Sequence, residues 1–93
     1  VAVNAQRIMK MRERLQALAP LALDVIDESD KHRGHAGARD GRGHFRVRIQ
    51  SARFDDLKPL ARHRLVYDAM GTMMQTDIHA LAIEARGTKE EVA

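Results

Sequence analysis

The apolar residues at the start of the chain recur every three or four positions over residues 4–19, which is the spacing of one helix face. That face consists of Ile8, Met11, Leu15 and Leu18. Asn4 is suited to cap the start of the helix, and Pro20 follows its end, where helices usually stop. The pattern therefore predicts a helix that packs along one side.

Two strands are predicted next, on either side of a long glycine-rich loop. Residues 21–29 contain a short run rich in β-branched side chains, whereas residues 44–50 alternate strictly between polar and apolar. The alternation assigns Phe45, Val47 and Ile49 to the core. It assigns His44, Arg46, Arg48 and Gln50 to the solvent-exposed face. Residues 30–43 hold four glycines and almost nothing apolar, which is typical of a functional or disordered loop.

A second helix and a third strand are predicted in the remainder of the chain. Residues 52–56 turn the chain, and a helix begins near Pro59 and runs to about Met74, with a break near His63. The buried side expected for this helix consists of Leu60, Leu65, Val66, Met70 and Met73. Its methionines are interpreted as core filling rather than as a cofactor or partner groove. Residues 78–85 alternate again, and Thr88 with Glu91 forms a capping-box pair that would open a short terminal helix.

This order of elements predicts a small α+β sandwich, a three-stranded mixed sheet with helices on one face. The first two strands are joined directly and should be antiparallel, whereas the second and third are joined through a helix and should be parallel neighbours. The 93 residues have room for one domain, with a core of about residues 8–86 and mobile residues before it and at 87–93.

The predicted topology would bring several histidines to one end of the sheet. His44 opens the second strand, His79 opens the third, and the loop with His32 and His35 enters the second strand at that end. Imidazole is a ready metal ligand, so this end is a candidate metal site. Two histidines supply only half a ligand set, which indicates a site completed by another molecule. The alternative is structural, with His79 hydrogen-bonded at the edge of the core and His44 without a role.

Charge and composition narrow the classes of function. Residues 31–64 contain ten lysines and arginines and three carboxylates, although the whole chain carries a net charge of only +3. This excess indicates a basic surface for nucleic acid or an acidic protein, or else a solvated arginine-rich loop. The chain has no cysteine, no apolar run long enough for a membrane and no nucleophile motif, and Asp55–Asp56 fits a turn. An enzyme is therefore not expected.

Several segments resemble the BolA family. The resemblance is carried by residues 54–67 (FDDLKPLARHRLVY), 78–81 (IHAL), 27–29 (DES), 44–47 (HFRV) and the loop rich in glycine and histidine. It extends over about residues 10–86, and its most specific part is the combination of Arg-His-Arg at 62–64 with His-Ala-Leu at 79–81. One departure is Asp56, where members often have glycine. The resemblance implies a fold like that of type II KH domains, with the order α-β-β-α-α-β.

The resemblance also implies a function. BolA-like proteins partner with monothiol glutaredoxins and share a bridging [2Fe-2S] cluster. By resemblance, His79 corresponds to the C-terminal cluster ligand, and the second ligand, a loop histidine or cysteine in the family, would be His35, with His32 as runner-up. The glutaredoxin and its glutathione would supply thiolates, a mixed ligand set like that of Rieske-type centres. The isolated chain would then hold no cluster and would be a monomer or a weak homodimer.

Some BolA-like proteins act as DNA-binding transcriptional regulators, which is the alternative that the resemblance implies. The residues expected to contact phosphates are Arg46, Arg48, Arg62, His63 and Arg64. No membrane partner is expected. The expected location is the bacterial cytoplasm, or the mitochondrial matrix if a leader has been removed.

Overall fold

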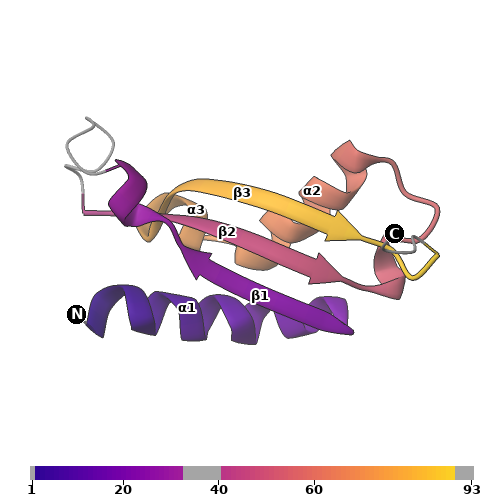
Figure 1. Cartoon of the computed structure of the whole chain (residues 1–93), viewed down its shortest axis with the longest axis horizontal. Coiled ribbons are helices and arrows are strands. Elements are labelled where there is room, and N and C mark those ends of the chain that lie inside the picture. Colours follow the sequence, from indigo (N-terminus) through magenta and orange to yellow (C-terminus); the bar gives the residue numbers. More distant parts are fainter. Residues whose placement is uncertain (1, 33–40, 90–93) are drawn as a thin grey trace.

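The computed structural model describes residues 2–32 and 41–89 of the chain. The elements in order are α1 (Ala2–Leu15), η1 (Gln16–Leu18), β1 (Ala22–Asp27), η2 (Ser29–His32), β2 (Gly43–Gln50), η4 (Ala52–Phe54), α2 (Pro59–Met70), α3 (Met73–Thr76) and β3 (Ile78–Arg86). In Figure 1, α2 and α3 lie behind the sheet and α1 runs along its β1 side. Within the described ranges, none of the helices has the length and apolar character that crossing a bilayer requires.

The three strands form one mixed sheet in the order β1-β2-β3. β1 pairs antiparallel with β2, so that Val25 lies opposite Val47, and β2 pairs parallel with β3, so that Val47 lies opposite Ile83. The predicted α+β class and the predicted directions of all three strands are confirmed. The parallel pair requires the crossover through α2 and α3, and these helices cover the inner face of the sheet.

The core lies between that inner face and the helices. Its buried apolar side chains are Met11, Leu15, Leu18, Phe45, Val47, Ile49, Phe54, Val66, Met70, Met73 and Ile78. The predicted apolar face of the first helix and the core-filling methionines are thereby confirmed. Asn4 does not cap this helix, because α1 already begins at Ala2 and Asn4 lies inside its first turns. The helix ends in η1, and Ala19 takes the left-handed conformation just before Pro20.

Two expectations for the second helix are wrong. The helix continues through His63 and breaks at Gly71, which has a positive φ of 58°, and Arg14 Nη1 donates to the carbonyl of Met70 at 3.2 Å. Leu60 is 64% exposed rather than buried. It precedes the buried Val66 by six positions, about 240° around the helix, and therefore points away from the core.

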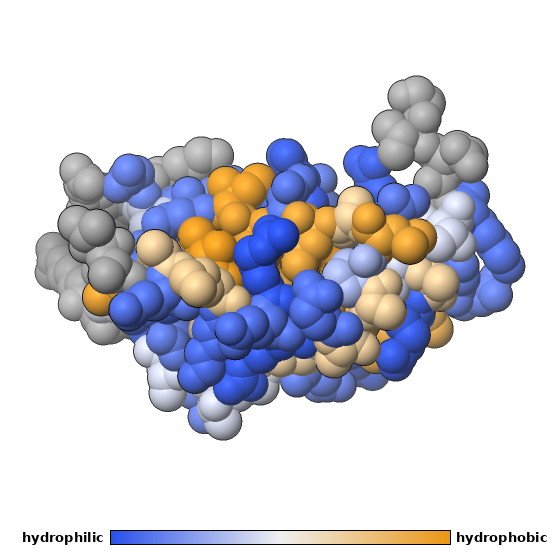
Figure 2. Space-filling view, turned by 90° about the horizontal axis from the view of Figure 1, so that it is seen from below, coloured by the Kyte–Doolittle hydropathy of each residue, from blue (hydrophilic) through white to orange (hydrophobic). Residues whose placement is uncertain are grey.

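The outer edge of β1 lies beside α1. Figure 2, which views the molecule from the side of α1, shows apolar atoms gathered in the middle of this face among polar ones. Val3, Met9 and Leu21 are large apolar side chains that remain exposed. Arg12 Nη1 donates to the carbonyl of Leu23 at 3.3 Å, which satisfies an acceptor of the edge strand.

Asp55 joins the turn before α2 to the segment that follows β3. Its Oδ1 accepts hydrogen bonds from the backbone N–H of Thr88 at 2.7 Å and of Lys89 at 3.4 Å, and its Oδ2 accepts one from the Thr88 hydroxyl. The side chain and the backbone N–H of Thr88 therefore bind Asp55. The predicted capping box of Thr88 with Glu91 involves residues outside the described ranges and stays a prediction. Asp56, at the position where glycine was expected, has a φ of 66°, a conformation that aspartate tolerates better than most residues.

We expect Gly43→Ala to destabilise the fold by about 1–3 kcal/mol, because overpacking a filled core forces side chains off their rotamers. A Cβ at this position would lie 2.5 Å from Cε2 and 2.6 Å from Cζ of Phe45. The Phe45 ring is only 1% exposed and cannot move aside. Urea unfolding followed by circular dichroism measures the change. In a Phe45→Leu background the same substitution should cost less, and equal costs in both backgrounds would contradict this explanation.

The Asp55 contacts should make stability depend on pH in the acid range. Hydrogen bonds from Thr88, stronger than the opposing effect of desolvation, lower the pKa of Asp55 below its ordinary value of 3.8. A carboxylate with a lowered pKa in the folded state contributes stability above its unfolded pKa and loses it as the pH falls through the folded one. The melting temperature of Asp55→Asn should therefore fall less steeply than that of the wild type below about pH 4. Parallel curves for the two proteins would show that Asp55 contributes nothing.

Candidate functional site

The starts of β2 and β3 form one end of the sheet, and two histidines meet there. The ring centroids of His44 and His79 are 5.1 Å apart, with the ring planes tilted by 38°. The predicted convergence is confirmed for this pair. We call the end of the sheet that carries His44 and His79 the histidine rim.

The expectation that His44 points to water is wrong. Its residue is only 7% exposed, although it lies on the sheet face opposite Phe45, whereas His79 is exposed. A register shift explains the difference: Gly43 pairs with Ile78 and His44 pairs with Ala80, so that His79 is the extra residue on β3. Such a bulge re-aims the side chain it carries.

The structure describes only one of the two predicted loop ligands. His35 lies outside the described residues. His32 ends η2, which follows β1 at the same end of the sheet as the histidine rim. The assignment of either residue as a ligand stays a prediction.

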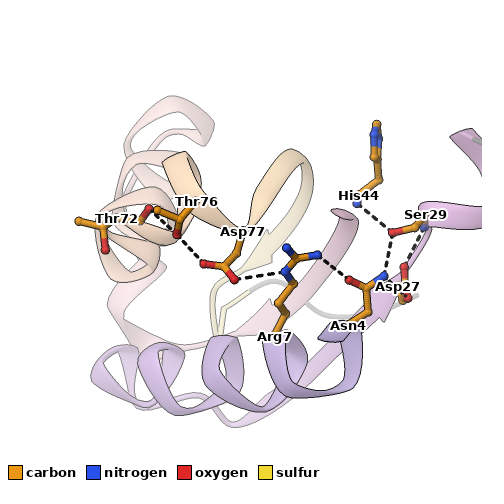
Figure 3. Close-up of polar contacts among 8 residues, drawn as sticks. All are labelled: Asn4, Arg7, Asp27, Ser29, His44, Thr72, Thr76 and Asp77. Atoms are coloured by element: carbon orange, nitrogen blue, oxygen red, sulfur yellow. Dashed lines mark hydrogen bonds and ion pairs between the residues drawn. The ribbon is translucent and has the colours of Figure 1, made fainter. Parts of the chain in front are cut away.

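Asn4 fastens α1 to the strands near the rim (Figure 3). Its Nδ2 donates to Oδ2 of Asp27 at 3.0 Å and to Oγ of Ser29 at 3.3 Å, and the same Ser29 oxygen accepts from the backbone N–H of His44 at 3.1 Å. Burial opposes ionisation of Asp27, but the hydrogen bonds from Ser29 and Asn4 outweigh it and lower the pKa of this carboxyl. The end of β1 and the start of β2 are therefore held by the same side chain of α1.

Arg7 makes the corresponding connection to β3. Its Nε lies 3.2 Å from Oδ2 of Asp77, and its Nη1 donates to Oδ1 of Asn4 at 3.0 Å (Figure 3). The hydroxyl of Thr76 and, to a smaller extent, Arg7 lower the pKa of Asp77 against partial burial. The carbonyl of Asp77 accepts from the N–H of Gly43 at 2.9 Å, so both strand starts are bonded to each other and to α1.

Arg42 contacts the rim, which the sequence pattern does not indicate. One of its guanidinium nitrogens, Nη2, lies 3.0 Å from Nδ1 of His79. In the sequence Arg42 is one basic residue among many in the loop. No local pattern could reveal a contact between residues 37 positions apart.

Arg46 and Arg48 lie on the face of the sheet that the helices leave open. Arg46 contacts two glutamates: its Nε lies 2.9 Å from Oε2 of Glu28, and its Nη1 lies 3.0 Å from Oε2 of Glu84. The same Glu84 oxygen lies 3.3 Å from Nε of Arg48. Hydrogen bonds to Glu28 and then Glu84 raise the pKa of Arg46. Desolvation opposes ionisation of Glu84, but the two arginines outweigh it and lower its pKa. Much of the positive charge predicted for this face is thus balanced locally.

The other predicted phosphate-binding residues lie on α2, on the opposite side of the sheet. Arg62 donates from Nε to the carbonyl of Leu57 at 2.9 Å and from Nη1 to that of Ala85 at 3.1 Å, which connects the turn before α2 to β3. His63 is half-buried and Arg64 is exposed. The structure therefore divides the five predicted residues between two faces and does not gather them into one surface.

The donor atoms of the rim limit what it can bind. Among the residues that the structure describes, no three histidine, cysteine, aspartate or glutamate side chains gather as a metal site. The rim offers imidazole nitrogens, one ring exposed and one covered, and the chain has no thiolate. It can contribute ligands to a metal group that another molecule also holds.

Known proteins resemble the chain along most of its length. A family described as BolA-like protein matches residues 15–90. The chain is 38% identical over 96 residues to SufE-like protein 1, chloroplastic/mitochondrial, of Arabidopsis thaliana, and 44% identical over 71 residues to BolA-like protein 1 of Mus musculus. These alignments cover 97% and 76% of this chain but only 26% and 50% of the two relatives, so the chain spans a quarter to a half of their length.

A bacterial relative is matched over more of its own length. The DNA-binding transcriptional regulator BolA of Escherichia coli (strain K12) is 37% identical over 87 residues, which are 88% of this chain and 80% of that protein.

Solved structures agree with the sequence comparisons. The BolA domain of SufE1 from Arabidopsis thaliana superposes with a TM-score of 0.80 at 38% identity, covering 91% of this chain and 95% of that one. BolA1 from the same plant superposes with a TM-score of 0.78 at 34% identity, covering 92% and 96%. With its sequence and its three-stranded fold both matched over most of their length, the chain belongs to the BolA family.

Proposed function

We propose that this chain is a non-enzymatic regulator that partners with a monothiol glutaredoxin and shares a bridging [2Fe-2S] cluster with it. His79 would be one ligand from this chain. The second would be His35, with His32 as runner-up, and the glutaredoxin and glutathione would supply thiolates. Membership of the BolA family supports the proposal, and none of the relatives named above bears the name of an enzyme.

The observation that carries the proposal is the exposed imidazole of His79 at the histidine rim. Histidine nitrogens replace two cysteine ligands in Rieske-type [2Fe-2S] centres, so imidazole from one chain and thiolates from another form a chemically sound set. The absence of cysteine from this chain agrees with that division of ligands. When bound, the cluster would supply redox-active iron and sulfide.

The remaining residues of the rim would hold the ligand in place. Arg7 bonds α1 to Asp77, two residues before His79. Asn4 bonds α1 to Ser29, whose hydroxyl accepts from the backbone N–H of His44. Groups that orient metal ligands are typically as important as the ligands themselves. In this proposal the bonds of α1 keep His79 at the edge of the sheet, facing the partner.

His79→Ala should weaken cluster retention in the complex with little change in the fold, because the side chain is exposed. The protein would be mixed with a monothiol glutaredoxin, iron, sulfide and glutathione, and the cluster followed by visible absorption and circular dichroism. His63→Ala is the matched control, since His63 lies on α2 away from the rim. His35→Ala and His32→Ala identify the second ligand. Unchanged spectra for both His79→Ala and His35→Ala would refute the ligand assignment.

DNA binding is the second candidate, and one observation favours it: the bacterial relative is named a DNA-binding transcriptional regulator. In this chain Arg62 is bonded to backbone carbonyls and Arg46 to two glutamates, which leaves the exposed Arg64 as the clearest phosphate contact. A surface of this kind supports binding to the DNA backbone more readily than reading of bases.

The isolated chain should bind duplex DNA weakly and without sequence preference, with a Kd of about 10⁻⁴–10⁻⁶ M at physiological salt. Arg64→Ala should weaken binding equally on two unrelated duplexes and reduce the salt dependence, whereas Arg46→Ala should have a smaller effect. Fluorescence anisotropy at several salt concentrations measures both. A promoter sequence bound about 10³-fold more tightly than other DNA would make the regulator the better description.

A further inference from the structure

The contact between Arg42 and His79 determines which nitrogen of the histidine ring is available. Arg42 stands just before β2, and Gly41 before it has a positive φ of 83°. Its Nη2 lies 3.0 Å from Nδ1 of His79, whose ring also lies beside that of His44. The most exposed imidazole of the rim is therefore already engaged in the isolated chain.

The contact between the Arg42 guanidinium and the His79 imidazole indicates which ring nitrogen carries the proton. A guanidinium carries five N–H donors and no acceptor, so Nδ1 of His79 must be the acceptor in this contact. The ring proton then resides on Nε2. A metal-bound imidazole needs a lone pair on one nitrogen and usually donates a hydrogen bond from the other. In the observed arrangement Arg42 occupies the lone pair of Nδ1, and the proton blocks Nε2.

We propose that Arg42 is a gating residue for His79, which keeps the imidazole from coordinating metal until a carboxylate draws the guanidinium away. The metal in this statement rests on the proposed function, whereas the Arg42–His79 contact does not. A guanidinium forms charge-assisted, often bidentate hydrogen bonds with a carboxylate, and the opposite charge of the carboxylate adds an attraction that the neutral ring lacks. A carboxylate arriving beside the rim would therefore compete effectively with the ring for Arg42.

The carboxylate has two sources in the proposed complex. Glutathione carries two carboxylates, and an acidic side chain of the glutaredoxin offers the same group. The positive charge of Arg42 itself attracts either anion to the rim. The gate would couple the availability of His79 to the arrival of the partner or its glutathione.

The first experiment uses the chain alone. Long-range ¹H–¹⁵N NMR of the imidazoles should show the wild-type His79 with its proton on Nε2, and Arg42→Ala should show a mixture of tautomers. In a titration with Zn²⁺ alone, followed at the His79 signals, Arg42→Ala should bind roughly two- to tenfold more tightly, the ratio expected from one net hydrogen bond. Arg64→Ala is the matched control and should behave as the wild type. The proposal would be refuted if the wild-type His79 carried its proton on Nδ1. It would also be refuted if the wild type and Arg42→Ala bound Zn²⁺ with equal affinity.

The second experiment distinguishes the sources of the carboxylate. Glutathione alone and glutaredoxin alone are added to the wild type and to Arg42→Ala. The true source should move the wild-type His79 signals towards those of Arg42→Ala and leave the variant unchanged. If neither addition alters the tautomer of His79 in the wild type, the proposal that a carboxylate displaces Arg42 is refuted. Failure of the proposed function would look different, because no shared cluster would then form with either protein.

Discussion

β2 pairs in parallel with β3, and this pairing shapes both the core and the histidine rim. A parallel neighbour cannot be reached through a tight turn, so the chain must cross over through α2 and α3. These helices then cover the inner face of the sheet, and the core forms between them and β2. The same pairing brings the starts of both strands to one end, where His44 and His79 meet although they are 35 positions apart in the sequence.

A register shift and several side-chain hydrogen bonds determine the detailed geometry of the histidine rim. The register shift at Gly43 makes His79 the extra residue of β3, and Gly43 has no Cβ, where one would collide with the ring of Phe45. From the other side, Asn4 and Arg7 of α1 bond to the residues that flank both strand starts. The rim is thus built from segments that lie far apart in the sequence.

The arginines show why a count of charges is a poor guide to a binding surface. Arg46 and Arg48 are balanced by Glu28 and Glu84, and Arg62 is bonded to backbone carbonyls. Ion pairs and carbonyl contacts of this kind leave less positive potential for a distant anion than the formal charge suggests. The number of basic residues in this chain is therefore weaker support for a broad DNA-binding face than it first suggests.

The order and the approximate positions of the helices and strands follow from the sequence alone, because hydrophobic periodicity is local: the alternation around Val47 and the helical spacing around Met11 are sufficient. The exact helix ends do not, as the break at Gly71 shows. The sequence also determined the strand directions, through the length of each connection. Which faces of these elements are covered depends on how they pack together. His44 was assigned correctly to the outer face but proved buried, and Leu60 proved exposed, because periodicity specifies a direction and not what lies in that direction. The contact of Arg42 with His79 likewise depends on two strand starts being brought together, and no pattern along the chain contains that information.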